Sequence, residues 1–266
     1  KIESIIIKGN KKTEDYIILR EIKQKSNTNL NQENILEDKN RVYNLGLFSD
    51  VDIEVVDNSY VITVSETWYI WPFPIIKYDH RIDQFSYGGG IMNSNFRGRD
   101  EEIAFGTTFG SIKEYFLWYE NPWISGDHNS LELGIYNESS EHYVYNIIER
   151  NKGFFIGSGF YKGDNKKIKF GINYNNKLIE ENIKSNNTNL ASNYLEQSKF
   201  KYIRLDIEYE YDTRDVYIDP HSGILFNIEL DNMLGFEKTQ NIYALEIIFN
   251  IYKNIYPYYK SINPIF

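Results

Sequence analysis

Three carboxylates stand two residues apart in one segment, at Asp206, Glu208 and Glu210. Carboxylates at such close spacing could act as a general acid–base pair or as ligands of a cation. In an extended strand, however, residues i and i+2 point to the same side, so these three would line one wetted wall. We therefore interpret them as part of a solvated face and not as catalytic groups.

Two further features could carry chemistry, and both have simpler explanations. The tripeptide Gly88-Gly89-Gly90 lacks the Lys-Ser/Thr and the helix that follow a phosphate-binding loop, so we expect it to leave room inside a strand. The histidines lack the i, i+4 spacing of a helical zinc pair, and they are His80, His128, His142 and His221. The chain has no cysteine. We predict that it is not an enzyme and that it binds no metal and no cofactor.

The composition favours a membrane interface over nucleic acid. A net charge of −9 argues against a phosphate backbone as the main partner, whereas 23 tyrosines suit a membrane–water boundary. The longest apolar run, Trp68–Ile76, is broken by Pro72 and Pro74 and is too short for a spanning helix. The mean hydropathy of −0.52 remains compatible with a membrane β-barrel, whose strands need only alternate residues to be apolar.

The segment 201–230 predicts a long antiparallel hairpin with two different faces. From Ile203 to Asp212 apolar and charged residues alternate strictly, and the pattern resumes from Ile224 to Leu230 after a turn rich in Asp, Pro and Gly. One face is apolar and the other is charged. The charged face could meet bulk water or the water inside a barrel.

Residues 1–67 mix helical and strand periods and predict a small β-α-α-β-β domain. The first strand should end at Gly9-Asn10. Thr13 is expected to cap the first helix. Asn31 is expected to cap the second helix, which Gly46 would end.

The two closing strands of this domain follow the second helix, over about 51–56 and 60–65. Val51, Ile53 and Val55 alternate with acidic residues in the first of them, which predicts one buried and one solvated face.

From about residue 68 to 266 only the strand period remains. We predict ten strands at about 70–79, 84–94, 101–110, 114–122, 130–138, 153–162, 167–178, 201–212, 223–232 and 242–253. The two long polar loops, 139–152 and 179–200, fall at the same end of such a sheet. Long loops at one end and short turns at the other are typical of outer-membrane barrels, although a soluble β-sandwich also alternates apolar and polar residues.

Both regions resemble one family. Residues 1–67 resemble a POTRA domain through Gly9-Asn10, Ile18-Leu19-Arg20 and the phrase from Tyr43 to Val51, which includes Gly46 and Phe48. The rest resembles the first part of the barrel of BamA-type outer-membrane assembly proteins, the bacterial surface-antigen family. The matching phrases are Asn95–Arg99, Asn121-Pro122-Trp123 and Tyr211–Gly223, the last with Asp212, Arg214, Pro220 and Gly223.

The chain also departs from this family. Its members close a sixteen-stranded barrel, contain a Val-Arg-Gly-Phe-type loop further on and, in BamA proper, usually carry several POTRA domains. About ten strands and one POTRA domain are present here. We therefore interpret the chain as a fragment that starts at the last POTRA domain, with an intact ten-stranded protein as the alternative.

The resemblance implies that the protein helps to fold and insert β-barrel proteins into the bacterial outer membrane, with its POTRA domain in the periplasm. The implied partners are membrane lipid, nascent barrel clients and accessory periplasmic lipoproteins. A lateral seam would lie at Trp71–Asp79, where Ile75 and Lys77 could contact a client. The strand carrying Val51, Ile53 and Val55 could bind extended segments by β-augmentation.

Two other functions remain open from the sequence. One is a related translocation pore, of the two-partner secretion or TamA type. The other is a soluble β-rich binding module.

Overall fold

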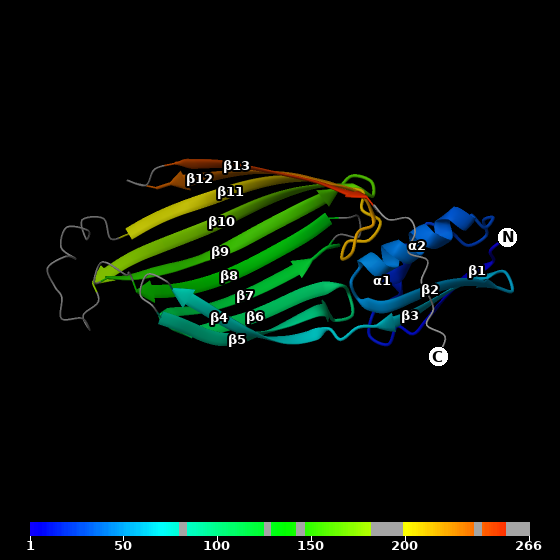
Figure 1. The fold of residues 1–266 in the computed structure, drawn as a ribbon, viewed down its shortest axis with the longest axis horizontal. Coiled ribbons are helices and arrows are strands. Elements are labelled where there is room, and N and C mark those ends of the chain that lie inside the picture. The colour runs from blue at the N-terminus through cyan, green and yellow to red at the C-terminus, as the bar shows by residue number, and fades with distance from the viewer. Residues whose placement is uncertain (80–83, 125–128, 142–146, 182–198, 237–240, 254–266) are drawn as a thin grey trace.

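The computed structural model describes residues 1–79, 84–124, 129–141, 147–181, 199–236 and 241–253. Two sheets account for the described strands, a small one at the N-terminus and a ten-stranded one that follows it (Figure 1). The chain is mainly β, as the sequence predicts. No helix among the described residues is long and apolar enough to cross a membrane.

The N-terminal domain has the predicted β-α-α-β-β order. Its elements are β1 (Ser4–Lys8), α1 (Asp15–Leu19), α2 (Gln32–Asn44), β2 (Phe48–Val56) and β3 (Ser59–Glu66). The sheet order is β1-β3-β2, with β1 parallel to β3 and β2 antiparallel to it. Apolar side chains from the helices and from one sheet face form the core, among them Ile18, Val42, Val51, Tyr60 and Ile62.

The helix ends confirm two of the three predicted caps. The Asn31 side chain accepts a hydrogen bond from the backbone N of Glu33 at 3.1 Å, and Gly46 follows α2 with φ of 71°. Thr13, however, does not cap α1. Glu14 takes the N-cap position without a side-chain bond. The Thr13 hydroxyl instead accepts a hydrogen bond from Nδ2 of Asn95 at 2.9 Å, because Thr13 lies where the two domains meet.

The large sheet runs strictly antiparallel in chain order. Its strands are β4 (Ile70–Asp79), β5 (Gln84–Phe96), β6 (Glu101–Gly110), β7 (Ile112–Asn121), β8 (Asn129–Glu141), β9 (Ile147–Tyr161), β10 (Lys166–Glu181), β11 (Lys199–Asp212), β12 (Ser222–Gly235) and β13 (Ile242–Lys253). The described β4 and β13 are its two edges and do not pair with each other, so the sheet is an incomplete barrel. The N-terminal domain lies at one end of the strands (Figure 1).

Both predicted long loops are too long. In place of a loop over 179–200, β10 continues to Glu181 and β11 already begins at Lys199. The sequence predicts a loop over 139–152, but β8 continues to Glu141 and β9 begins at Ile147, with Ser139 paired to Arg150. Residues 137–141 and 149–152 of this hairpin are polar on both faces, and the adjacent Ile147-Ile148 does not alternate, so the apolar alternation that marks a strand is missing there. Backbone pairing extends the ladder without it.

The two faces of the large sheet differ as the hairpin predicts. Ile207 of β11 lies opposite Leu230 of β12, and both are exposed on the outer face. Asp206 lies opposite Asp231 on the inner face. The outer face carries a broad band of exposed apolar side chains, including Phe105, Leu117, Ile135, Phe154, Ile156 and Phe170. A sheet with an exposed apolar outer face and a polar inner face is typical of a barrel wall that contacts lipid.

Glycines on the inner face make room for aromatic side chains of neighbouring strands. A Cβ placed on Gly90 would lie 2.3 Å from the Phe73 ring, and one on Gly106 would lie 2.5 Å from the Phe116 ring. Each ring therefore occupies the space that a side chain at the glycine would take. Gly88-Gly89-Gly90 lies inside β5, as the sequence predicts, and Gly90 leaves room there for the Phe73 ring.

Candidate functional site

The free edge of β4 has an unusual pattern of hydrogen-bonding groups. The carbonyl of Tyr69 accepts a hydrogen bond from the backbone N of Ser94 at 3.0 Å, so odd-numbered residues direct their backbone groups toward β5. The even-numbered residues therefore face the open edge. Pro72 and Pro74 are two of them and have no N–H. Between Ile70 and Ile76 this edge therefore presents carbonyl acceptors, but it lacks the backbone N–H donors at positions 72 and 74.

The predicted contact residues of β4 point to the inner face. Ile75 lies close to Gly106, and a Cβ there would lie 3.2 Å from the Ile75 Cδ1. Lys77 forms an ion pair with Glu114 of β7. Both side chains are half-buried and engaged with their own sheet. A client role for β4 would therefore use the backbone edge, and the role of these two side chains stays a prediction.

The second predicted contact strand, β2, is an edge of the small sheet and pairs only with β3 among the described strands. Val51 is 1% exposed and Ile53 is 7% exposed, so both side chains belong to the domain core, while Val55 is 40% exposed. The backbone edge of β2 is open to strand addition. β2 and β4 belong to separate sheets and do not form one site.

The structure brings together a different set of residues, which we call the junction: the contacts between the N-terminal domain and the turns at the near end of the large sheet. The β5–β6 turn contributes first. The backbone N of Glu14 donates to the carbonyl of Gly98 at 2.9 Å. Arg99 Nε donates to Glu14 at 3.0 Å, and Asn95 is fully buried against Thr13.

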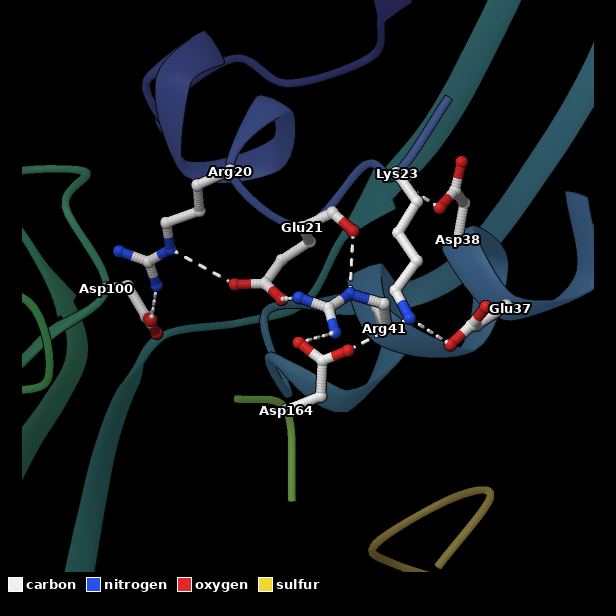
Figure 2. A network of polar contacts seen from close by, with 8 residues as sticks. All are labelled: Arg20, Glu21, Lys23, Glu37, Asp38, Arg41, Asp100 and Asp164. Carbon is white, nitrogen blue, oxygen red and sulfur yellow. Dashed lines mark hydrogen bonds and ion pairs between the residues drawn. The ribbon is translucent and has the colours of Figure 1, made fainter. Parts of the chain in front are cut away.

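An ion-pair network forms the centre of the junction (Figure 2). Arg20 contacts Glu21 at 3.2 Å and also pairs with Asp100 of the β5–β6 turn. Its guanidinium lies 4.5 Å from the ring centroid of Trp123, in the segment after β7.

The β9–β10 turn joins this network through Asp164. Its carboxylate accepts from Lys23 at 2.9 Å and from Arg41 at 3.1 Å. Arg41 Nε also donates to the carbonyl of Glu21 at 2.7 Å, and Lys23 pairs with Glu37 at 2.5 Å. The network therefore ties α1, α2 and two turns of the large sheet into one unit.

The β11–β12 turn contains the third family phrase of the large sheet, Tyr211–Gly223, and adds the last contacts. Asn44 of α2 accepts from the backbone N of Tyr217 at 3.1 Å and donates to the carbonyl of Asp215 at 3.2 Å. Within the turn, Arg214 pairs with Asp212 at 2.7 Å. Pro220 lies in the turn, and Gly223 has φ of 116° where it returns to β12.

The motif residues of the N-terminal domain are structural. Gly9 has φ of 92°, and a Cβ there would lie 2.0 Å from the carbonyl of Val64. Asn10 Nδ2 donates to the carbonyl of Thr13 at 2.9 Å and to Asp15 at 2.6 Å. Phe48 is buried in the core. These residues shape the loop and the domain that approach the large sheet.

Burial and pairing act in opposite directions on the acids of the junction. Burial raises the pKa of Asp100 to about 7, and Arg20 opposes part of that rise. Burial also raises the pKa of Glu21. The hydrogen bond from Lys23 lowers the pKa of Asp164.

We expect docking of the N-terminal domain to weaken as the pH rises from about 5 to about 8. Asp100 binds its proton more tightly when docked, so its contribution is full below the ordinary pKa of 3.8 and is lost as the pH passes about 7. Asp164, whose pKa is lowered, contributes fully above its ordinary pKa of 3.8 and loses that contribution only below it, outside this pH range. Spin labels at Leu36→Cys and Ile218→Cys, both exposed, would report the distance between α2 and the β11–β12 turn.

The Asp100→Asn variant should lose most of this pH dependence, and the Asp164→Asn variant should keep it. A wild-type distance distribution that stays constant over this range would contradict the expectation.

The described residues hold no cluster of three or more acidic or histidine side chains placed to bind a metal ion. His80, His128 and His142 lie outside the described residues, and Asp206, Glu208 and Glu210 line the inner face. The sequence did not indicate that Arg20, Glu21, Arg41, Asp100 and Asp164 form one site. One feature of the sequence does indicate where the site lies: the three family phrases of the large sheet all fall at connections that share one end of the sheet.

A lipid-facing antiparallel sheet entered directly from a small β-α-α-β-β domain defines a class, the outer-membrane β-barrel proteins with POTRA domains. Residues 95–263 match the Omp85 superfamily domain, and residues 1–67 match a POTRA domain described as a surface antigen variable number repeat. The chain belongs to the Omp85 superfamily. No curated protein matches its sequence at a significant level.

Solved structures share this fold at low sequence identity. BamA from Haemophilus ducreyi lacking POTRA domains 1–3 matches with a TM-score of 0.59 and 18% identity, covering 87% of this chain and 48% of that one. CdiB from Acinetobacter baumannii matches at 0.55 and 10% identity, covering 94% and 48%. CdiB from Escherichia coli matches at 0.57 and 9% identity, covering 93% and 51%. The chain therefore spans about half the length of these proteins.

Proposed function

We propose that the protein helps to fold and insert β-barrel proteins into the bacterial outer membrane. The observation that carries the proposal is the β4 edge, which is unpaired among the described strands and lacks two N–H donors at Pro72 and Pro74. In this proposal the N-terminal domain lies in the periplasm, and the opposite end of the large sheet lies at the cell surface.

The physical reason is the cost of unpaired backbone groups in hydrocarbon, several kcal/mol for each group. A nascent strand that enters the membrane needs a partner edge. The β4 edge can accept hydrogen bonds through carbonyls, while the two prolines keep the pairing incomplete. Incomplete pairing favours a temporary template that can release its client.

Other partners follow from the same arrangement. The open edge of β2 would bind an extended client segment or an accessory periplasmic lipoprotein by β-augmentation, near Val55. The outer face of the large sheet would contact membrane lipid.

A translocation pore is the second candidate function. It is supported by the polar inner face, which carries Lys169, Asp206 and Glu208, and by TM-scores for CdiB that are close to the score for BamA. The donor-poor β4 edge favours insertion, since a pore does not need a pairing edge.

Depletion of the protein in its natural host tests the proposal. We expect folded, heat-modifiable outer-membrane barrel proteins as a group to fall several-fold, because their edge strands lose their template. A cell that assembles its barrels normally but fails to export one secreted protein would favour the pore instead.

Complementation with Pro72→Val/Pro74→Val sharpens the test. This variant restores two edge donors, each worth about 1 kcal/mol, and should slow client release and lower barrel assembly. The matched control, Ile70→Val/Ile76→Val, leaves the edge donors unchanged and should complement fully. Equal complementation by both variants would contradict the role of the edge.

A further inference from the structure

Five basic side chains gather on the outer face of the large sheet, at the end away from the N-terminal domain. The register places Lys113, Arg150 and Lys199 in one row across β7, β9 and β11. Lys152 and Lys201 occupy the next row, two residues nearer the middle of the strands. We call these five residues the basic belt.

The spacing of the basic belt suits phosphate groups. Alternate strands of a sheet lie roughly 10 Å apart, and rows two residues apart are separated by roughly 7 Å. Arg150 pairs with Glu180 at 3.3 Å. Lys152 is exposed, and none of the acidic side chains that the structure describes lies within ion-pair distance of it. The local excess of positive charge contrasts with the net charge of −9 for the whole chain.

A groove of about 370 Å³ on the same face is lined at one end by Lys152 and extends from there toward the middle of the strands. Ile135 and Phe154 line its apolar part. One side is formed by Phe154 stacked on Tyr174, with ring centroids 5.5 Å apart. The other side is formed by Tyr115, whose hydroxyl accepts a hydrogen bond from Asn137 Nδ2 at 2.6 Å. The groove therefore joins a cation at one end to an apolar surface at the other.

We propose that the basic belt and this groove form a binding site for an anionic, phosphate-bearing lipid of the surface-facing leaflet. The headgroup phosphate lies between Lys152 and Lys201, and an acyl chain lies along Ile135 and Phe154. The charges match, and the cations stand at the boundary where the apolar band ends, the depth at which headgroups lie. The site rests on the proposed orientation in the membrane and not on the insertion activity.

Native mass spectrometry of the protein expressed from its complete natural gene tests the site. The purified protein in detergent is titrated with phosphatidylglycerol, and retained lipid is counted. Each cation near a headgroup is worth about fivefold in affinity, so Lys152→Gln/Lys201→Gln should bind about 25-fold more weakly than wild type. The control Lys166→Gln removes an outer-face lysine at the opposite end of the sheet and should bind as wild type does.

Three results would overturn the site. They are unchanged affinity in the double variant, an equal loss in Lys166→Gln, and displacement of the lipid by excess inorganic phosphate, which would make this a site for free phosphate. Heat-modifiability shows that each variant is folded. Because no client is present, a negative result leaves the proposed insertion activity standing, and failure of insertion in cells leaves this affinity unchanged.

Discussion

Substitution of Gly98 by Ala is expected to release the N-terminal domain from the large sheet. Gly98 has φ of 76°, which disfavours a side chain, and an added Cβ would lie 2.1 Å from the carbonyl oxygen of Lys12. Neither atom belongs to a flexible side chain, so the backbones must separate. The hydrogen bond from Glu14 to Gly98 would be lost with them. We expect docking to weaken by about 2 kcal/mol, roughly thirtyfold.

Gly163→Ala is the matched control for this substitution. Gly163 also lies in a turn at the near end of the large sheet and has φ of 69°, but nothing lies within 4 Å of its added Cβ. Both variants carry the cost of the backbone conformation, and only Gly98→Ala carries the contact. The spin-label distance between α2 and the β11–β12 turn should broaden in the first variant alone. An equal change in both would show that the close approach at Gly98 does not hold the domain.

Strand alternation predicted most of the large sheet because lipid and water impose opposite demands on its two faces. Asp206 and Ile207 are adjacent in sequence, and Ile207 suits the lipid face while Asp206 suits the water-filled face. Alternation does not mark residues 137–141 and 149–152 of the β8–β9 hairpin, where both faces are polar, so the predicted loop there is too long. Prolines likewise identified β4 as an edge, since a central strand does not tolerate them.

The junction could not be predicted in the same way, because its contacts join residues far apart in the chain. Arg20 and Asp100 are 80 positions apart, and Asn44 is 171 positions from Asp215. No local pattern specifies which turn a given charge will meet. The family phrases marked the correct turns, but they gave no pairing, and Thr13 was mistaken for a cap because its junction role has no local signature.

This arrangement explains why the family phrases of the large sheet fall in turns and not in strands. A strand in lipid needs only apolar side chains on one face, which many residues provide. The turns that receive the N-terminal domain each need particular residues. The β5–β6 turn needs a left-handed glycine at 98, and the segment after β7 needs the Trp123 ring for Arg20. The β11–β12 turn needs the carboxylate of Asp215, which accepts hydrogen bonds from three backbone N–H groups close by. The sequence is therefore most specific where the two domains meet.

Arg20→Met is expected to have the largest effect on docking of any single change of charge. The Arg20 side chain is 9% exposed, and its removal leaves the carboxylates of Glu21 and Asp100 with one partner fewer in a buried site. Methionine keeps the apolar stem of arginine, so the packing changes little. Breaking a buried pair costs about 3 kcal/mol or more, about 150-fold in the docking equilibrium. The loss should be smaller near pH 5, where Asp100 carries a proton.

A double-mutant cycle with Asp100→Asn separates the pair from the rest of the network. Asparagine removes the charge and tolerates the φ of 59° at this position. We expect Arg20→Met/Asp100→Asn to dock better than Arg20→Met alone, because a neutral amide is left in place of an unpaired carboxylate. Lys39→Met, which removes an exposed pair with Asp52 at 3.7 Å, should change docking by less than about 1 kcal/mol. If Arg20→Met docks as tightly as Lys39→Met, the ion-pair network does not hold the two domains together.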